Sequence, residues 1–329
     1  MTQPDLALAI PEAAEQALPR SGRWRRLDSS SGRRRPGVLR YWPQYLAISP
    51  FYVLFAVFGL FPVLFSLYLS FHRWSGVGER KWVGLQQYRF LVKDHTFYLS
   101  LWNTLLIWGM STLPMLFGAL VLAAMLHSVA RAKGFYRMAF FIPNITSTVA
   151  VAIFFGALFA KNYGLVNAGL HGLGLPMVDW LRDPWGMKVV IAALTVWQWA
   201  GYNAIIYLAG LQTISSELYE QARIDGAGPV QTFFRLTLPL LRPFIVFTVV
   251  MSTIGGLQTF TEPAVLVGTG GGVSQGALTM VLYFYQQAFT HNDYGYGATI
   301  AAAVFVIVTV VTLLNWLLTQ RERRGEVPR

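Results

Sequence analysis

The chain has 329 residues, of which 54% are hydrophobic and 12% are charged, with a net charge of +11 and no cysteine. A soluble domain carries about 25% charged residues, so this composition indicates an integral membrane protein. The lack of cysteine excludes disulfides, thiolate metal sites and cysteine nucleophiles. The basic charge does not indicate a nucleic-acid partner, because the arginines flank apolar stretches, as topology signals do.

Residues 1–40 are polar and rich in arginine, serine and glycine, which predicts a disordered basic cytoplasmic tail and not a cleaved signal peptide. Six apolar stretches follow, each long enough to cross a hydrocarbon core of roughly 30 Å. We therefore predict an all-α membrane domain over 41–320 and a short cytoplasmic tail over 321–329. The predicted spans are 45–71, 99–126, 138–160, 187–211, 240–261 and 296–319. A shorter apolar segment, 276–289, is predicted to be re-entrant or interfacial.

The distribution of Lys and Arg predicts the orientation. With six spans and the N-terminus inside, most of the 26 Lys and Arg residues lie on the cytoplasmic side. We therefore expect a multi-pass protein of the bacterial cell (inner) membrane with both termini in the cytoplasm. The first outer loop is an exception, since it carries Arg73, Arg80, Lys81, Arg89 and Lys93.

The stretch from Ser216 to Pro243 is the longest amphipathic and charged interruption between spans. It predicts a helix, a turn and a second helix. Serines at 215 and 216 suit the start of the first helix, acidic residues lie in its first turn, and Gly226 follows its end. Pro229 suits the first position of the second helix, and Leu238-Pro239 is predicted to end it before the next span. A structured cytoplasmic loop of this kind indicates a docking surface.

Several kinds of chemistry lack the residues that they need. None of the five lysines follows a glycine, so the chain has no phosphate-binding Gly-Lys-Ser/Thr loop. The interiors of the predicted spans hold no Asp, Glu, Lys, Arg or His, which disfavours coupling to protons or sodium. The five histidines are scattered without ligand spacing, so no metal site is predicted. Asp179 and Asp183 form a possible carboxylate pair, but their loop favours a structural or docking role, and no catalytic residue is predicted.

The spans do contain neutral polar and aromatic side chains. Amides and hydroxyls bind sugar hydroxyls and aromatic faces cover apolar sugar faces, so this set suits a pathway for an uncharged, hydroxyl-rich solute. Hydrogen bonding and packing between helices is the alternative explanation for each residue singly. The candidate pathway residues are Asn144, Trp197, Trp199, Tyr202, Asn203, Gln258, Thr259, Thr261 and Glu262.

The loop at 216–243 resembles the segment that marks permease subunits of binding-protein-dependent ATP-binding-cassette (ABC) importers. That segment reads Glu-Ala-Ala, three residues, Gly, nine residues, Ile, one residue, Leu-Pro. Here Glu220-Gln221-Ala222, Gly226, Leu236 and Leu238-Pro239 have the same spacing, with departures at Gln221 and Leu236. The resemblance extends over residues 41–320, through stretches at 135–151, 163–167, 201–212, 252–263 and 283–301. In detail the chain resembles carbohydrate permeases of the maltose type, and among them the first permease of cellobiose- and lactose-type systems.

The resemblance implies a type I ABC importer permease fold with six transmembrane helices and a cytoplasmic coupling helix within 216–239. It implies four kinds of partner: a second homologous permease in a heterodimer, two ABC ATPase subunits, an extracytoplasmic sugar-binding protein and the lipid bilayer. ATP and Mg would be held by the ATPases, so this chain would bind no cofactor and would not be an enzyme. The residues expected at the ATPase contact are Glu217, Glu220, Gln221, Ala222, Asp225, Gly226, Ala227, Leu236, Leu238 and Pro239.

The expected substrate is a disaccharide or oligosaccharide such as cellobiose or lactose. An importer of another solute, such as glycerol-3-phosphate, is the first alternative, although the spans offer no buried cation for a phosphate. A membrane-embedded glycosyl- or lipid-modifying enzyme would need catalytic carboxylates or a metal triad. A scaffold that only docks an ATPase would not need the polar groups inside the spans.

Overall fold

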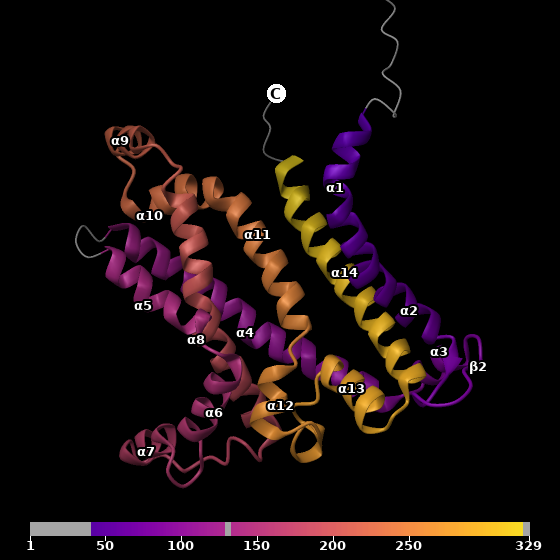
Figure 1. Ribbon diagram of the computed structural model, residues 1–329. Helices are drawn as coiled ribbons and strands as arrows, with labels where there is room; N and C mark the ends of the chain where they lie inside the picture. Colours follow the sequence, from indigo (N-terminus) through magenta and orange to yellow (C-terminus); the bar gives the residue numbers. More distant parts are fainter. Residues whose placement is uncertain (1–40, 129–132, 325–329) are drawn as a thin grey trace, which may run out of the picture. The chain divides into compact units, whose positions relative to one another are not determined.

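The computed structural model describes residues 41–128 and 133–324, and the described chain is almost entirely helical (Figure 1). The all-α class is thereby confirmed. The predicted tail 1–40 lies outside the described residues, as does 325–329 of the predicted C-terminal tail. The chain divides into two units, Met1–Phe58 and Gly59–Arg329.

The described part of the first unit contains helix α1 (Trp42–Leu54). A π-helical segment follows it at Phe55–Leu60. Pro50 lies inside α1 and has no N–H for the carbonyl of Leu46, four residues earlier. The hydroxyl of Ser49 donates to that carbonyl at 2.9 Å. A side chain thus satisfies the backbone group that the proline leaves free, and the helix continues through it.

The second unit begins with α2 (Phe61–Leu69), which leads into a hairpin and a short helix. Strands β1 (His72–Arg73) and β2 (Lys81–Trp82) pair antiparallel, with His72 opposite Trp82 and Arg73 opposite Lys81. Helix α3 (Gln86–Leu91) follows. The hydroxyls of Ser70 and Tyr88 lie 2.7 Å apart and join the end of α2 to α3.

Four long helices form the centre of the second unit: α4 (His95–Ser128), α8 (Pro184–Leu211), α11 (Leu238–Leu257) and α14 (Tyr294–Arg324). Ala119 and Ala123 of α4 are fully buried in the same cluster as Ala204 and Tyr207 of α8. In a membrane the hydrophobic effect does not drive helices together, so helix association depends on close packing. Small residues such as these allow the helix backbones to approach closely. The Tyr207 hydroxyl then reaches Thr248 of α11 at 2.6 Å, which links α8 to α11.

The segment predicted as one span over 138–160 is broken. Helices α5 (Lys133–Ile145) and α6 (Thr148–Leu158) meet at an angle of 93°. The side-chain amide of Gln198 in α8 donates to the carbonyl of Thr146 and to the Thr148 hydroxyl. The backbone groups at a helix end inside the membrane need hydrogen-bond partners from the protein, because lipid offers none. Here a side chain of α8 supplies them, and the hydrophobic periodicity of 138–160 does not reveal this contact.

The loop predicted as helix, turn and helix contains α9 (Ser216–Ile224) and α10 (Pro229–Thr232). The prediction that Leu238-Pro239 ends the second helix is wrong. A π-helical turn at Phe233–Thr237 joins α10 to α11, and the helix runs without interruption from Pro229 to Leu257. In that turn the Leu238 N–H bonds the Phe233 carbonyl five residues back, and this wider pairing carries the helix past the missing N–H of Pro239.

Short elements connect the long helices at one end of the second unit. They are α7 (Leu165–Gly172), α12 (Thr261–Val267), a 3₁₀ turn at Val273–Gln275, α13 (Met280–Tyr285) and a π-helical turn at Gln286–Thr290. Helices α9 and α10 lie at the opposite end (Figure 1). Among the described residues, five helices are long and apolar enough to cross a membrane, or six when the bent pair α5–α6 counts as one span.

Candidate functional site

A cavity of about 610 Å³ lies between α4, α8, α11 and the start of α12. Hydroxyl, amide and aromatic side chains alternate with apolar ones around it. The residues that line it are Thr112, Met115, Thr195, Trp199, Tyr202, Asn203, Ile206, Phe247, Thr248, Met251, Ser252, Gly255, Gly256, Gln258, Thr259, Phe260, Thr261 and Glu262.

One face of α8 supplies two aromatic side chains of the wall, Trp199 and Tyr202. Its contributions follow the helical repeat, since Thr195, Trp199 and Tyr202 are spaced by four and three residues. The rings of Trp199 and Tyr202 lie edge to face with centroids 5.8 Å apart. The Asn203 amide beside them is nearly fully buried and donates to the Trp199 carbonyl at 3.0 Å. This wall therefore presents a fixed aromatic pair to the cavity.

The end of α11 and the start of α12 supply the polar part of the wall. The helix stops at Leu257, and Gln258, an exposed residue of the lining, follows. The Thr259 hydroxyl donates back to the Gly256 carbonyl at 2.9 Å, and the Thr259 carbonyl accepts from Thr279 at 2.7 Å. Glu262 lies in the first turn of α12, and burial raises the pKa of its carboxyl group above the usual value.

Seven of the nine residues predicted for a pathway line this cavity, and two do not. Trp197 lies on another face of α8, two residues from Trp199, and its ring packs against Phe155 of α6 at 5.8 Å. Asn144 lies near the end of α5, where its buried amide nitrogen has no hydrogen-bond partner among the described residues. Neither residue is therefore placed where a solute in the cavity would meet it.

Sequence reasoning missed the contributions of α4 and α11. Thr112 and Met115 come from α4, and Phe247, Met251 and Gly255 recur every four residues along α11. The four-residue repeat was present in the sequence. Apolar residues with this repeat look the same whether they face lipid, another helix or a cavity, so no local signal selected them.

The predicted ATPase-coupling residues lie at the opposite end of the unit, on and after α9. That helix has no buried residue. Glu217, Glu220, Gln221, Asp225 and Gly226 are exposed, as is Pro239 beyond the loop, and Ala222, Ala227, Leu236 and Leu238 are half-buried. The Tyr219 hydroxyl lies 3.2 Å from that of Thr237 and ties α9 to the π-helical turn.

Gly226 ends α9 with φ of +75°, in the left-handed region that glycine tolerates best. Its N–H bonds the Arg223 carbonyl at 3.1 Å, and the next N–H, of Ala227, bonds the Ala222 carbonyl at 2.9 Å. This pair of bonds is the Schellman arrangement that closes a helix end. At the other end, Ser215 is the N-cap residue, but its side chain makes no capping bond.

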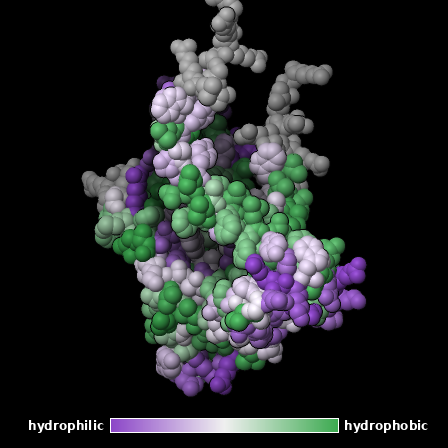
Figure 2. Space-filling view, turned by 45° about the vertical axis from the view of Figure 1, so that its right-hand side comes forward, coloured by the Kyte–Doolittle hydropathy of each residue, from purple (hydrophilic) through white to green (hydrophobic). Residues whose placement is uncertain are grey.

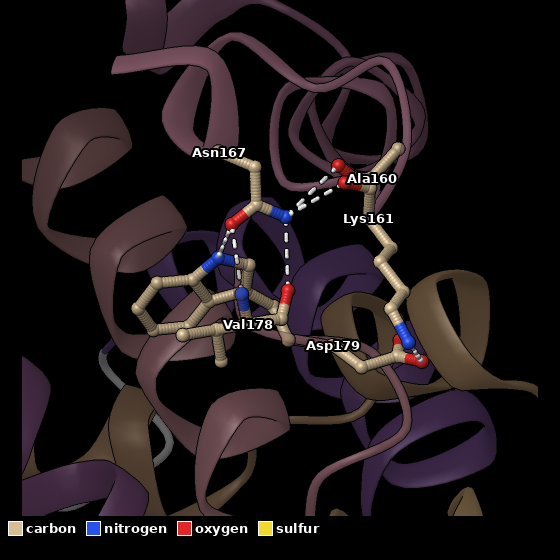
Figure 3. A network of polar contacts seen from close by, with 6 residues as sticks. Ala160, Lys161, Asn167, Val178 and Asp179 are labelled. Carbon is tan, nitrogen blue, oxygen red and sulfur yellow. Dashed lines mark hydrogen bonds and ion pairs between the residues drawn. The ribbon is translucent and has the colours of Figure 1, made fainter. Parts of the chain in front are cut away.

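The loop between α6 and α8 is organised by one buried amide, that of Asn167 (Figure 3). Its nitrogen donates to the carbonyls of Ala160, Lys161 and Val178, at 2.9 to 3.3 Å. Its oxygen accepts from the Val178 N–H and from the indole of Trp180. Hydrogen bonds to Asn167 therefore give the long loop a defined conformation.

The two aspartates of this loop have structural partners, which supports their structural interpretation. Asp179 forms an ion pair with Lys161 at 3.3 Å. Asp183 caps α8, where its carboxylate accepts from the Gly186 N–H at 2.6 Å. Each carboxylate has a partner within the loop or at the start of α8. These contacts favour a structural role over that of a general acid and base.

Comparisons with known proteins agree with this arrangement. The family model described as "Binding-protein-dependent transport system inner membrane component" matches residues 115–324. The arabinooligosaccharides transport system permease protein AraP of Bacillus subtilis is 36% identical over 82% of this chain and 86% of its own length. The lactose transport system permease protein LacF of Rhizobium radiobacter is 36% identical over 88% of this chain and 98% of its own.

The fold also matches a solved structure, a bacterial ABC transporter involved in the import of the acidic polysaccharide alginate. The TM-score is 0.76 at 25% identity, over 86% of this chain and 97% of that one. The family match covers more than half of the chain, and the curated relatives align over most of their own lengths. The chain is therefore a multi-pass membrane protein of the binding-protein-dependent transport system inner membrane component family, and its relatives include permease subunits of sugar ABC importers.

Proposed function

We propose that this chain conducts a neutral disaccharide or oligosaccharide across the bacterial inner membrane, through the cavity between α4, α8 and α11. The observation that carries the proposal is the lining of that cavity, which contains the rings of Trp199 and Tyr202 together with hydroxyl and amide groups at the end of α11. Aromatic rings cover the apolar faces of sugar rings, and amides and hydroxyls bind sugar hydroxyls. The printed names of two relatives, for arabinooligosaccharides and lactose, fit the same class of solute.

The charge of the lining favours a solute without negative charge. Among the described residues that line the cavity, Glu262 is the one ionisable at neutral pH, and none is Lys, Arg or His. A phosphate would face this carboxyl group without a cation to bind it. Glycerol-3-phosphate is therefore a weaker candidate than a neutral sugar.

The energy for transport comes, in this proposal, from two separate ATPase subunits that hold ATP and Mg. Helix α9 offers them a docking surface, because it is exposed and carries both charged and apolar side chains. Glu217 and Glu220 are exposed, Leu218 is 37% exposed, and Ile224 at the end of the helix is 85% exposed. An exposed amphipathic helix suits a groove on a partner and transmits force by packing. In this topology both chain termini and α9 are cytoplasmic.

The remaining partners are a second homologous permease, which completes the pathway, and an extracytoplasmic sugar-binding protein. One solved relative is described as an alginate ABC transporter in complex with an oligosaccharide-bound periplasmic protein. We expect the same kind of delivery here, with a different sugar.

The test is reconstitution of the whole importer in proteoliposomes, with ATP inside and the binding protein outside. We expect uptake of labelled lactose, cellobiose or an arabinooligosaccharide that needs both ATP and the ATPase subunits, and no competition by glycerol-3-phosphate. Chemical modification of the sugar by this chain alone would favour the membrane-embedded enzyme instead. ATP-dependent uptake of glycerol-3-phosphate but of no sugar would refute the substrate class.

A further inference from the structure

The hairpin between α2 and α3 carries three exposed cations, Arg73, Arg80 and Lys81. We call residues 72–82 the basic hairpin. Its strand register puts Arg73 directly opposite Lys81. Like charges in opposite positions of an antiparallel pair destabilise it. Among the residues that the structure describes, the ion pair within 4.0 Å is that of Lys161 and Asp179. No described carboxylate, Glu79 of the same hairpin included, lies within that distance of these three cations.

The backbone of the basic hairpin is held in place by contacts with α2 and α14. The Trp74 carbonyl accepts from the N–H of Tyr294, at the start of α14, at 3.0 Å. The Trp74 indole donates to the Gly78 carbonyl at 3.2 Å across the turn. The His72 ring nitrogen lies 2.8 Å from the Tyr68 carbonyl of α2. The backbone that carries Arg73 and Lys81 in opposite positions is therefore held in place.

Arg80 shows at what depth the basic hairpin lies. Its guanidinium group is 5.9 Å from the ring centres of Phe65 and Tyr68, and 6.0 Å from that of Trp74. Phe65 and Tyr68 belong to the last turns of α2, which ends at Leu69 and closes the first candidate membrane span. Trp82, 67% exposed, lies on the same hairpin. Arg and Trp side chains gather in this way at the boundary between hydrocarbon and headgroups.

Figure 2 agrees with this description. It brings the right-hand side of Figure 1 forward, and a cluster of hydrophilic side chains protrudes there at the height of β2 and α3, beside apolar surface. Arg89 and Lys93, on and just after α3, add two more exposed cations to the region.

We propose that the basic hairpin binds the phosphate of an anionic phospholipid headgroup, chiefly through Arg73 and Lys81. A phosphodiester accepts hydrogen bonds from a guanidinium and an ammonium group together and removes the repulsion between them. A lipid is favoured over an acidic protein surface because Arg80 places the hairpin level with the end of a membrane span, where lipid phosphates lie. The site adds a fixed lipid contact beside α2 and α14, and it does not depend on which solute the cavity takes.

Native mass spectrometry of the purified full chain tests this site. The protein is offered equal amounts of phosphatidylglycerol and phosphatidylcholine, and retained lipids are counted. We expect the wild type to retain phosphatidylglycerol preferentially, and the double variant Arg73→Gln/Lys81→Gln to lose affinity by about fivefold for each charge removed. The exchange variant Arg73→Lys/Lys81→Arg keeps both charges and should keep the preference. Arg182→Gln, which removes an exposed cation elsewhere, should also keep it.

Melting temperature supplies a second readout that separates binding from folding. In phosphatidylcholine the double variant should be at least as stable as the wild type, because the repulsion is gone, and added phosphatidylglycerol should stabilise only the wild type. A less stable variant in phosphatidylcholine would show that the cations are structural. Equal stabilisation by inorganic phosphate at the same concentration would overturn the lipid assignment. So would an unchanged lipid preference with weakened association of the sugar-binding protein.

Discussion

Two of the tryptophans in α8, Trp197 and Trp199, allow a controlled test of the cavity as the sugar pathway. Trp199 lines the cavity and is 40% exposed, whereas Trp197 is 45% exposed but packs on Phe155 away from it. A large aromatic side chain presents up to about 250 Å² of surface, so Trp199 offers about 100 Å² to a solute. A sugar ring that covers half of it removes about 50 Å² from water, which at about 25 cal/mol per Å² contributes about 1.2 kcal/mol.

Trp199→Ala should therefore lower the kcat/KM of sugar uptake by about eightfold. The assay is uptake by proteoliposomes that contain the complete importer, with the sugar-binding protein in excess, alongside sugar-stimulated ATP hydrolysis. Trp197→Ala is the matched control, in which the same side chain is removed two residues away. It should lower the melting temperature, because the contact with Phe155 is lost, and leave kcat/KM within about twofold of the wild type. Equal losses of uptake in both variants, or none in Trp199→Ala, would refute the placement of the pathway.

Two further predictions concern α9, the proposed coupling helix, and the loop between α6 and α8. Gly226→Ala should lower the free energy of unfolding by about 1 kcal/mol, because alanine adopts the positive φ at the end of α9 less readily than glycine. Nothing lies within 4 Å of an added Cβ, so no steric clash contributes. The variant should also lower sugar-stimulated ATP hydrolysis. The control is Gly118→Ala within α4, where an added Cβ also meets nothing within 4 Å, and it should leave both stability and ATP hydrolysis unchanged. Normal ATP hydrolysis in Gly226→Ala would contradict the coupling role of α9. Asn167→Asp should destabilise its loop by more than about 3 kcal/mol, because a carboxylate would face three carbonyl oxygens, and limited proteolysis should cut between residues 161 and 183. Asp179→Asn removes only a partly exposed ion pair and should cost less than about 1 kcal/mol; an equal effect in both variants would refute the central role of Asn167.

The part of the cavity wall that α8 forms was predictable because it depends on one helix. Trp199, Tyr202 and Asn203 share a face of α8 by their spacing alone. The break between α5 and α6 was not predictable, because it depends on a side chain 50 residues away. Gln198 satisfies the backbone and hydroxyl groups around the bend, and only the packing of α8 against α5 and α6 brings it there. Gly201 permits that packing, since a Cβ at this position would lie 1.7 Å from the Phe140 carbonyl oxygen.

The wrong prediction at Leu238-Pro239 concerns how the two ends of the permease are joined. A helix that stopped there would leave a flexible joint between the exposed docking helix and the membrane. The structure instead has one uninterrupted helix from Pro229 to Leu257, with a π-helical turn at Phe233–Thr237. Its far part lines the cavity with Phe247, Met251 and Gly255, and its near part holds α9 through the contact between Tyr219 and Thr237. In the proposed mechanism, a displacement of α9 by an ATPase would reach the wall of the cavity through this continuous helix and not through a loop.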